Sequence, residues 1–456
     1  MSFFKAYDMR GEFGRDFNLD TVYRVGRWLP VLLDARRMLV GRDARLSSEA
    51  VRDELCRGLT ESGCVVDDMG LATTPMVYFF TARDAYDASV QITASHNPAS
   101  HNGMKISRAG ALPVGYDSGL AELERRVMSE ELPASAAKAG ERRQIDCRER
   151  FVEWLCRYRS DFSGLRFAVD CSDGVAGILA RELFGEGPLY LNDTPDGNFP
   201  HHAPNPMEAE NRDQLKEAVL AQGLDAGVIF DGDADRVMFV DETGVFVQPD
   251  YLIPLVARHF LDTEPGATVI HDIRTSRGVI ETLKADGARP LMGKVGHAFA
   301  KILLRESGAV CGGELAGHYY FRDFFFCDSG ELAALLILEA LAASKRRGVS
   351  FSRLMAPIRK YANSGERNYR IADKDGAIKA VLAYVEDCGK PLARVDFDGV
   401  RVDFSDWWVN VRKSNTEPYL RLVAEAADAE TLARRLKGLE QALASFIGGG
   451  RTGCGV

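Results

Sequence analysis

Apolar and polar residues follow one another along this chain in blocks, and the blocks predict strands and helices in a repeating order. An apolar strand, an acidic turn, a helix, a glycine and a second apolar strand occur in this order three times. This succession is typical of βαβ units in a largely parallel sheet, so we predict three related α/β domains. The first strands are expected at 38–40, 167–169 and 268–270, the turns at Asp43, Asp170 and Asp272, the helices near 50–59, 175–184 and 278–284, and the second strands at 65–66, 189–191 and 290–292.

The C-terminal part of the chain has a different pattern, which predicts a small α+β domain. Asp398-Gly399 between two apolar runs is a hairpin signal. Strands are expected at 368–371, 395–397, 400–404, 407–411 and 419–423, and helices at 375–386 and 427–446. Linkers expected near 134–143, 241–248 and 358–364 divide the chain into domains at 1–143, 144–245, 246–360 and 361–456.

Composition excludes several classes of protein. The 456 residues carry 57 basic and 66 acidic side chains, a net charge of −9, without the basic stripe of a nucleic-acid-binding protein. No apolar run is long enough to cross a membrane, and we expect no signal peptide. Nine cysteines without a C-x-x-C pair are expected to be reduced thiols. We therefore expect a cytoplasmic monomer or weak dimer that binds a small molecule, with no nucleic-acid or membrane partner.

The strongest chemical signal is an acidic loop with Asp231, Asp233 and Asp235 between two apolar runs. Alternating carboxylates on a short loop can converge on one hard cation. A solvated acidic turn is the plainer interpretation. A calcium loop is a further alternative, since Glu242 falls at its twelfth position, but Arg236 occupies the sixth position, where that loop needs glycine.

Ser95 lies in a second candidate segment, residues 93–98, on a loop near His96 and Lys105. A hydroxyl among basic groups can act as a nucleophile or phosphoryl carrier. The turn dipeptides Asn97-Pro98 and Asn102-Gly103 also allow a simple polar turn. The segment lacks the G-x-S-x-G pattern of lipase-type hydrolases.

Two further loops complete a set of four. The glycine-rich segment 312–318 carries Glu314, which could accept hydrogen bonds from sugar hydroxyls, and His318, which could carry a proton. The basic segment 412–418, with Arg421 beyond it, suits a phosphate. Alone, each could be an ordinary surface turn. Together the four segments offer a nucleophile, a metal-binding loop, a residue that binds sugar hydroxyls and a loop that binds phosphate. Phosphoryl transfer to a sugar requires all four.

In this order the four segments resemble the α-D-phosphohexomutase superfamily, over essentially the whole chain. Residues 7–11, 41–45 and 195–200 fit as well, and residues 319–324 and 327–330 look most like the bacterial phosphomannomutases, some of which also act on glucose phosphates. The resemblance implies three similar α/β domains with mixed sheets and a C-terminal α+β domain around a central cleft. It also implies an isomerase that interconverts hexose 1-phosphate and hexose 6-phosphate through a phosphoserine and a hexose 1,6-bisphosphate.

The resemblance also implies roles for particular residues. Ser95 would be the phosphoserine, and one Mg²⁺ would be held by Asp231, Asp233, Asp235 and an oxygen of the Ser95 phosphate. Glu314 would bind sugar hydroxyls, and Lys105 or His318 would be the general acid or base. The non-reacting phosphate would be held by Arg412, Ser414, Asn415, Thr416 and Arg421, and the cleft would be lined by Tyr7, Arg10, His96, Lys105, Arg236, Arg274, His297 and His318.

One residue departs from the family pattern. Ala316 stands where relatives usually have a serine that helps to hold a sugar hydroxyl, so this chain lacks one donor and acceptor, worth about 1 kcal/mol of binding. The preference between mannose and glucose therefore stays open. The alternatives are a phosphoglucosamine mutase or another phosphohexomutase specificity, a serine-dependent sugar phosphatase, and a non-catalytic sugar-phosphate-binding protein.

Overall fold

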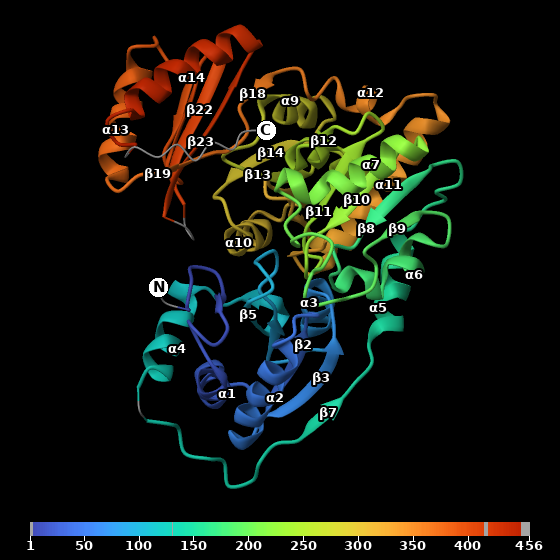
Figure 1. The fold of residues 1–456 in the computed structure, drawn as a ribbon, viewed down its shortest axis with the longest axis vertical. Coiled ribbons are helices and arrows are strands. Elements are labelled where there is room, and N and C mark those ends of the chain that lie inside the picture. The colour runs from blue at the N-terminus through green and yellow to red at the C-terminus, as the bar shows by residue number, and fades with distance from the viewer. Residues whose placement is uncertain (1–2, 130, 415–417, 448–456) are drawn as a thin grey trace.

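The protein is described from a computed structural model, which places residues 3–129, 131–414 and 418–447. Four sheets follow one another along the chain and define domains 1 to 4 (Figure 1). In this view domain 1 lies at the bottom, domains 2 and 3 lie to the right and centre, and domain 4 lies at the upper left. The first three sheets are mixed and the fourth is antiparallel, which confirms the predicted fold class.

Domain 1 comprises strands β1 (Met9–Glu12), β2 (Arg37–Arg42), β3 (Val65–Leu71), β4 (Ala88–Ile92), β5 (His101–Arg108), β6 (Leu112–Pro113) and β7 (Arg142–Gln144), and helices α1 (Leu19–Leu33), α2 (Ser48–Glu61), α3 (Thr74–Arg83) and α4 (Leu120–Val127). The sheet order is β1-β5-β4-β2-β3-β7, with β6 on β5. Helix α3 begins at the cap residue Thr73, whose hydroxyl accepts a hydrogen bond from the Met76 amide. The predicted boundary after residue 143 falls inside β7, which pairs with β3.

Domain 2 comprises strands β8 (Phe167–Asp170), β9 (Leu189–Leu191), β10 (Ala226–Phe230), β11 (Val237–Asp241) and β12 (Phe246–Val247), and helices α5 (Arg148–Leu155), α6 (Ala180–Phe184) and α7 (Asp213–Gln222). The sheet order is β12-β11-β10-β8-β9. The stretch 241–248, where a linker was expected, contains the short strand β12, which pairs with β11. The polar residues there form a turn, in which the Asp241 carboxylate accepts hydrogen bonds from the Thr243 and Val245 amides.

Domain 3 comprises strands β13 (Thr268–Asp272), β14 (Arg289–Gly293), β15 (Cys311–Gly313), β16 (Tyr319–Phe321) and β17 (Cys327–Asp328), and helices α8 (Ile253–Leu261), α9 (Arg277–Ala285), α10 (His297–Ser307), α11 (Gly330–Arg346) and α12 (Phe351–Met355). The sheet order is β14-β13-β15-β16-β17. Helix α11, capped by Ser329, is buried over most of its length and packs on both α8 and β11. It therefore joins domain 3 to domain 2.

Domain 4 comprises strands β18 (Ala362–Asn363), β19 (Arg367–Arg370), β20 (Ala393–Val395), β21 (Val400–Asp403), β22 (Trp407–Lys413) and β23 (Tyr419–Ala426), and helices α13 (Lys374–Glu386) and α14 (Ala429–Leu443). The sheet order is β18-β23-β22-β21-β20, with β19 on β23. The predicted hairpin is confirmed, with Asp398-Gly399 between β20 and β21 and Gly399 at φ 64°. The two helices pack against each other and on the sheet.

The predicted repeat is present in domains 1 to 3. The strand pairs β2–β3, β8–β9 and β13–β14 are all parallel. At the C-terminal end of each first strand a carboxylate accepts a hydrogen bond from the backbone amide two residues later, in the pairs Asp43–Arg45, Asp170–Ser172 and Asp272–Arg274. The second unit differs from the prediction, because a 3₁₀ turn (Val175–Ile178) precedes the short α6 where one helix was expected.

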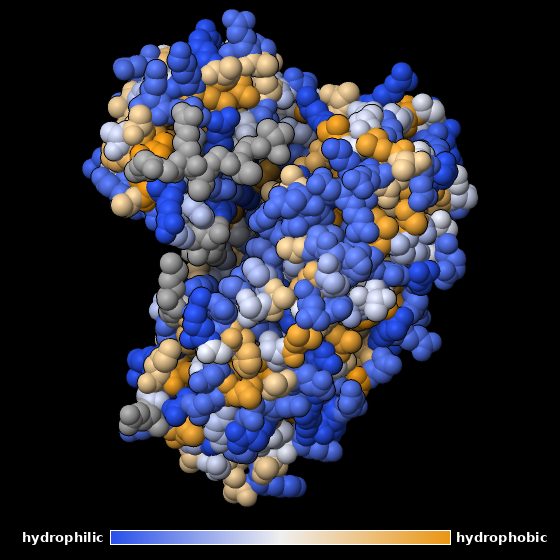
Figure 2. Space-filling view, in the orientation of Figure 1, coloured by the Kyte–Doolittle hydropathy of each residue, from blue (hydrophilic) through white to orange (hydrophobic). Residues whose placement is uncertain are grey.

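One apolar core is shared by domains 1 to 3, whereas domain 4 has its own. Rings from the three domains meet at Phe79 of α3, Phe151 of α5 and Phe324. The surface in Figure 2 is hollowed on the left, between domain 4 above and domain 1 below. Over the described part of the chain, no helix combines the length and the apolar character that a membrane span requires.

Candidate active site

Ser95 lies on the loop between β4 and β5, with a left-handed backbone at φ 50° and no exposed surface. Its amide donates a hydrogen bond to the Thr93 hydroxyl. Its hydroxyl donates to Oδ2 of Asp231 at 2.7 Å and lies 3.2 Å from Nδ1 of His96. The loop thus aims the serine hydroxyl across the boundary between domains 1 and 2, at the predicted metal loop.

The acidic loop is the turn of the hairpin formed by β10 and β11, as its flanking apolar runs predict. Asp231, Asp233 and Asp235 are fully buried, and one ligand atom from each lies within 4.8 Å of the others. The flanking strands argue against a calcium loop, which needs helices on both sides. Burial of all three side chains excludes a solvated acidic turn.

Lys105 of β5 is a cation that faces this cluster. Its Nζ donates to Oδ2 of Asp233 at 2.7 Å and also to Asp235. Burial works against the charge of Lys105, yet the carboxylates of Asp233 and Asp235 raise its pKa above the usual range. Burial and these two neighbouring carboxylates raise the pKa of Asp231, whereas Lys105 outweighs burial at Asp233 and lowers its pKa. A second cation, Arg236, lies 3.8 Å from Oδ2 of Asp231, so both ends of the cluster face a positive charge.

The arrangement fits one divalent cation. Oδ1 of Asp233 and Oδ1 of Asp235 are buried and accept no hydrogen bond from the described residues. Buried carboxylate oxygens are costly unless they are paired or bind a metal. Their other oxygens are held in place by Lys105 and, at Asp233, by the Thr74 hydroxyl. The three aspartates are therefore pre-arranged for a divalent metal that binds oxygen ligands.

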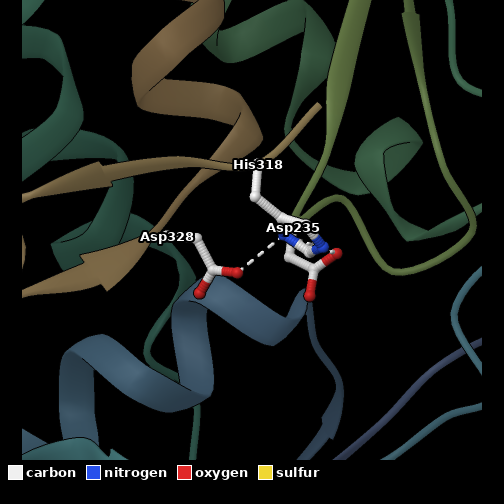
Figure 3. A group of neighbouring side chains, drawn as sticks. All are labelled: Asp235, His318 and Asp328. Atoms are coloured by element: carbon white, nitrogen blue, oxygen red, sulfur yellow. Dashed lines mark ion pairs between the residues drawn. The ribbon is translucent and has the colours of Figure 1, made fainter. Parts of the chain in front are cut away.

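His318, which directly precedes β16, lies beside the acidic loop. Its Nε2 accepts a hydrogen bond from Nε of Arg236 at 3.0 Å. Its Nδ1 lies 2.8 Å from Oδ2 of Asp328 and 3.8 Å from Oδ1 of Asp235 (Figure 3). Lys301 pairs with the other oxygen of Asp328 at 2.7 Å. Arg236 thus donates a hydrogen bond to His318, and Lys301 is paired with Asp328. Because these side chains already have cationic partners, we interpret the group as an ion-pair network and not as a second metal site.

Two aromatic residues extend the site toward the surface. Tyr7 donates a hydrogen bond to the Val295 carbonyl, and its ring meets the edge of the His297 ring. Burial and the charge of Lys301 lower the pKa of His297 well below the usual range. Beyond Tyr7 a groove of 610 Å³ is lined by residues of domain 1 and by Phe299 of α10. Arg10 of β1 donates to the Asn97 side chain and so borders the serine loop.

Glu314 and Arg274 form a second buried group. Glu314 accepts hydrogen bonds from the Tyr320 hydroxyl at 2.6 Å and from the Gly296 amide at 3.2 Å. Arg274 lies 3.7 Å from Glu314 and donates to Glu366 at 3.0 Å. Arg412 and Arg421 of domain 4 also reach Glu366, at 3.5 and 3.0 Å. Glu314 is thus connected to the predicted phosphate loop through ion pairs.

The remaining predicted residues belong to the loop between β22 and β23. The Ser414 amide donates to the Tyr419 carbonyl. Asn415 and Thr416 lie outside the described residues. In the described part of the chain, no ion pair or hydrogen bond joins Arg412 directly to the Ser95 group.

Sequence reasoning missed several residues that hold this site together. Asp328 stands in a segment that resembled the family, but nothing in the sequence pointed to His318 as its partner. Lys301 reads as an ordinary helix lysine, and Glu366 as a linker glutamate. Thr74 is separated from Asp233 by more than half of domains 1 and 2. In each case the partner is distant in the sequence, so no local pattern carries the signal.

The four-domain fold and a serine facing a buried carboxylate triad define an enzyme of phosphoryl transfer. Family models for phosphoglucomutase/phosphomannomutase match all four domains in order: alpha/beta/alpha domain I at 1–133, domain II at 149–244, domain III at 248–361 and the C-terminal domain at 366–441. The chain belongs to the phosphoglucomutase/phosphomannomutase family, and with it to the α-D-phosphohexomutase superfamily that its motifs resembled. It is accordingly an isomerase that moves a phosphoryl group.

Characterised relatives match over nearly the full length. A phosphomannomutase of Salmonella montevideo is 38% identical over 455 residues, covering 97% of this chain and 99% of the relative. The phosphohexose mutases of Xanthomonas campestris pv. campestris (strain B100) are 38% identical, with 96% and 98% covered. A solved phosphoglucomutase/phosphomannomutase family protein of Burkholderia thailandensis superposes with a TM-score of 0.88 at 30% identity, covering 98% of each chain.

Proposed function

We propose that the protein is a phosphomannomutase that interconverts mannose 1-phosphate and mannose 6-phosphate through phosphorylated Ser95. The observation that carries the proposal is the 2.7 Å contact between the buried Ser95 hydroxyl and Asp231, within a triad suited to a divalent cation. The phosphomannomutases similar to the chain over nearly its whole length support mannose as the sugar.

The proposed reaction has two transfers. The free hydroxyl of the bound hexose phosphate attacks phosphorus of phospho-Ser95, the bond from phosphorus to the serine oxygen breaks, and the hydroxyl proton passes to a base. The hexose 1,6-bisphosphate then turns over and returns its other phosphoryl group to Ser95. Asp231, Asp233 and Asp235 would hold Mg²⁺, which when bound supplies positive charge that offsets the charge of the transferring group. Lys105 and Arg236 add fixed positive charge around that group.

His318 suits the role of base better than Lys105. Two carboxylates surround Lys105 and raise its pKa, so this ammonium keeps its proton. His318 instead has Nδ1 turned toward Asp328, while its Nε2 accepts a hydrogen bond from Arg236. The Nε2 lone pair can receive the substrate proton once the Arg236 guanidinium turns from His318 to the transferring phosphoryl group. We assign His96 to support of the serine hydroxyl, because burial and nearby cations keep its pKa low.

The other side chains are assigned to the substrate. Glu314 would bind sugar hydroxyls, with Tyr7, Arg10, Arg274 and His297 around it. Arg412, Ser414, Asn415, Thr416 and Arg421 would hold the phosphate that is not reacting. Because Ala316 lacks the hydroxyl that helps to hold the sugar in relatives, the proposal includes activity on glucose phosphates.

The test is a mutase assay with mannose 1-phosphate and glucose 1-phosphate side by side, in Mg²⁺ with a trace of hexose 1,6-bisphosphate. We expect conversion of mannose 1-phosphate to the 6-phosphate. Ser95→Ala should lose nearly all turnover, while Ser100→Ala, an exposed serine of the same loop, should keep it. Release of inorganic phosphate without isomerised sugar, or full activity of Ser95→Ala, contradicts the proposal.

A further inference from the structure

Three arginines from two domains converge on one carboxylate, that of Glu366. Oε1 of Glu366 accepts from Arg274 of domain 3 at 3.0 Å and from Arg412 of β22 at 3.5 Å. Oε2 accepts from Arg421 of β23 at 3.0 Å. Arg274 and Arg412 are almost fully buried, and the Glu366 side chain is 14% exposed. The carboxylate therefore spans the junction between domains 3 and 4.

The backbone around Glu366 is fixed to domain 4. Glu366 lies between β18 and β19, directly after Gly365, which has a left-handed backbone at φ 63°. The Ser364 amide donates to the Ala424 carbonyl, and the Ala424 amide donates to the Ser364 hydroxyl. These bonds attach the turn to β23, the strand that also carries Arg421. Glu366 and the two domain 4 arginines are thus held as one unit.

Through Arg274 this unit reaches the glycine-rich loop of domain 3. Two nitrogens of Arg274 donate to Asp272, and Nη2 lies 3.7 Å from Glu314. A continuous series of ionic contacts therefore leads from the proposed sugar ligand Glu314, through Arg274 and Glu366, to the proposed phosphate ligands Arg412 and Arg421. Glu366 is the member that bridges the domains.

Among the described residues, the charge of Arg412 is paired less closely than that of Arg274. Arg274 is also paired with Asp272, but Arg412 reaches Glu366 only at 3.5 Å, and its buried Nε finds no acceptor among the described residues. A buried cation with unused donors favours an additional anion. Burial alone would make Glu366 harder to ionise, yet Arg274, Arg421 and Arg412 lower its pKa to about 2. The carboxylate is thus a permanent counter-charge that leaves donors of Arg412 for a phosphate.

We propose that Glu366 is a positioning residue, which holds Arg412 and Arg421 in the arrangement that binds the non-reacting phosphate and couples that phosphate to the sugar loop through Arg274. The mannose phosphate part of this inference rests on the proposed function. Without the carboxylate, three guanidinium groups repel one another and the bridge between domains 3 and 4 is lost. Binding of phosphate must then order Arg412 and Arg421, and this cost makes the free energy of phosphate binding less favourable.

Binding is measured without turnover, by calorimetry of mannose 1-phosphate and of inorganic phosphate on the full chain carrying Ser95→Ala. We expect Glu366→Gln to raise the dissociation constants of mannose 1-phosphate and of inorganic phosphate about tenfold or more. The matched control is Glu281→Gln. Glu281 of α9 pairs with Lys360 and Tyr361, which belong to the linker expected at 358–364 just before Glu366. Among the described residues, no hydrogen bond or ion pair joins Glu281 to Arg274, Arg412 or Arg421. The affinity of this control should stay within about twofold of the parent, since exposed pairs contribute little.

Kinetics with Ser95 intact separate positioning from general damage. Glu366→Gln should raise KM for mannose 1-phosphate about tenfold and change kcat less than about threefold, because the affected phosphate is bound alike in ground and transition states. Glu366→Asp keeps the charge, but its shorter side chain cannot span Arg274 and Arg421 together, so it should show a smaller loss of about threefold. If Glu366→Gln does not fold, Glu366→Asp decides the question.

Wild-type or tighter phosphate affinity in Glu366→Gln, or in Glu366→Asp if that variant decides, overturns the proposal; tighter binding would mean that Glu366 competes with phosphate. An equal loss in Glu281→Gln overturns it too, because the effect would then come from the linker. If the wild-type protein shows no mutase activity but Glu366→Gln still weakens inorganic phosphate, the proposed function fails and the positioning role stands.

Discussion

At the scale of single residues, the conformation of Ser95 requires support from outside its own loop. A serine with φ 50° is strained and persists only where its surroundings enforce it. Arg45 provides that support, because its guanidinium donates to the carbonyls of Ser95 and Asn97 at 2.8 and 2.6 Å and to those of Pro98 and His101 at 2.6 and 3.0 Å. The Asp43 carboxylate fixes Arg45 in turn at 3.0 Å.

Arg45→Lys tests this support. An ammonium keeps the charge but cannot reproduce the planar fork, so several carbonyls lose their donor. We expect the free energy of unfolding to fall by about 3 kcal/mol and kcat to fall about 100-fold as the serine shifts. Chemical denaturation and the mutase assay measure the two effects. Arg15→Lys, at an exposed arginine, should change neither; an unchanged kcat in Arg45→Lys would contradict the expectation.

The pH dependence of stability can be traced to Asp250. This carboxyl is fully buried, and burial raises its pKa to about 7, although it accepts hydrogen bonds from the Ser276 amide and Gln248. Between about pH 4 and 7 the folded protein keeps a proton that the unfolded chain releases, so this group lowers stability as pH rises. Asp250→Asn removes that loss, and relative to wild type it should gain about 2–4 kcal/mol between pH 4 and 8.

Denaturation of both proteins at several pH values measures the difference. Asp117→Asn, at an exposed aspartate, should follow the wild-type curve. A constant difference between Asp250→Asn and wild type across this pH range would mean that Asp250 ionises normally in the folded protein.

The residues proposed to carry chemistry stand in local patterns that can be recognised in the sequence, whereas the residues that contact and position them do not. Ser95 and the aspartates of the acidic loop stand in short segments whose composition announces a function. Arg45 belongs to residues 41–45, which resemble a superfamily motif, but its supporting role could not be predicted because the carbonyls that it binds lie some 50 residues later. Asp328 and Glu366 act on partners in other elements, so their importance appears only when distances are known.

At the scale of elements, glycine decides how closely β1 and β5 approach. Gly103 of β5 pairs with Arg10 of β1, and an added Cβ would lie 2.0 Å from the Met9 carbonyl oxygen and 2.9 Å from that of Thr93. Both contacts are with backbone, which cannot move aside as a side chain can. The edge that presents Arg10 and the start of the serine loop therefore requires glycine here.

Gly103→Ala should separate β1 from β5 and lower the free energy of unfolding by about 3 kcal/mol. Hydrogen exchange should show loss of protection in β1. Gly187→Ala, at a glycine with open space around it, should be neutral or slightly stabilising. A Gly103→Ala protein as stable as wild type would mean that the strands separate at no cost.

The strands and helices of the repeat were predictable because apolar periodicity is local. The structure differs from the prediction where a polar turn lies inside a sheet. The turn after β11 has the composition of a linker, and only its pairing with β12 shows otherwise. In the second unit, Gly177 packs on the Asp193 carbonyl, where an added Cβ would lie 2.1 Å from the oxygen, and a 3₁₀ turn replaces the expected helix.

At the scale of the whole molecule, metal binding should stabilise the fold, because the metal site joins domains 1 and 2. A metal cation adds to the positive charge of Lys105 and Arg236 and further reduces the repulsion among the three carboxylates. Saturating Mg²⁺ at 100 times its dissociation constant should add about 2.7 kcal/mol, and EDTA should remove that gain along with activity. Thermal unfolding against Mg²⁺ concentration measures it. Asp233→Asn should lose the response and Asp225→Asn, a surface aspartate paired with Lys345, should keep it; the same response in both variants would contradict the metal assignment.

The order of four domains was predictable from motifs, but their packing was not. A shared apolar core joins domains 1 to 3. Domain 4 is attached by a small apolar cluster of Leu315, Trp408 and Val423 and by polar contacts such as those of Arg401 with the Ile273 and Thr275 carbonyls. Polar contacts of this kind leave no periodic trace in a sequence.

Because the side chains of the site come from all four domains, the order of synthesis matters. Ser95 leaves the ribosome early and Arg421 roughly 300 residues later, a delay of about 15–60 s at ~5–20 residues per second. During that interval the serine loop is present but the domain 4 residues proposed to bind phosphate are not. Domain 1 also exposes the apolar face of α3, which domains 2 and 3 later cover. A nascent chain is thus inactive until Arg421 has been translated, and until then its exposed apolar faces favour aggregation.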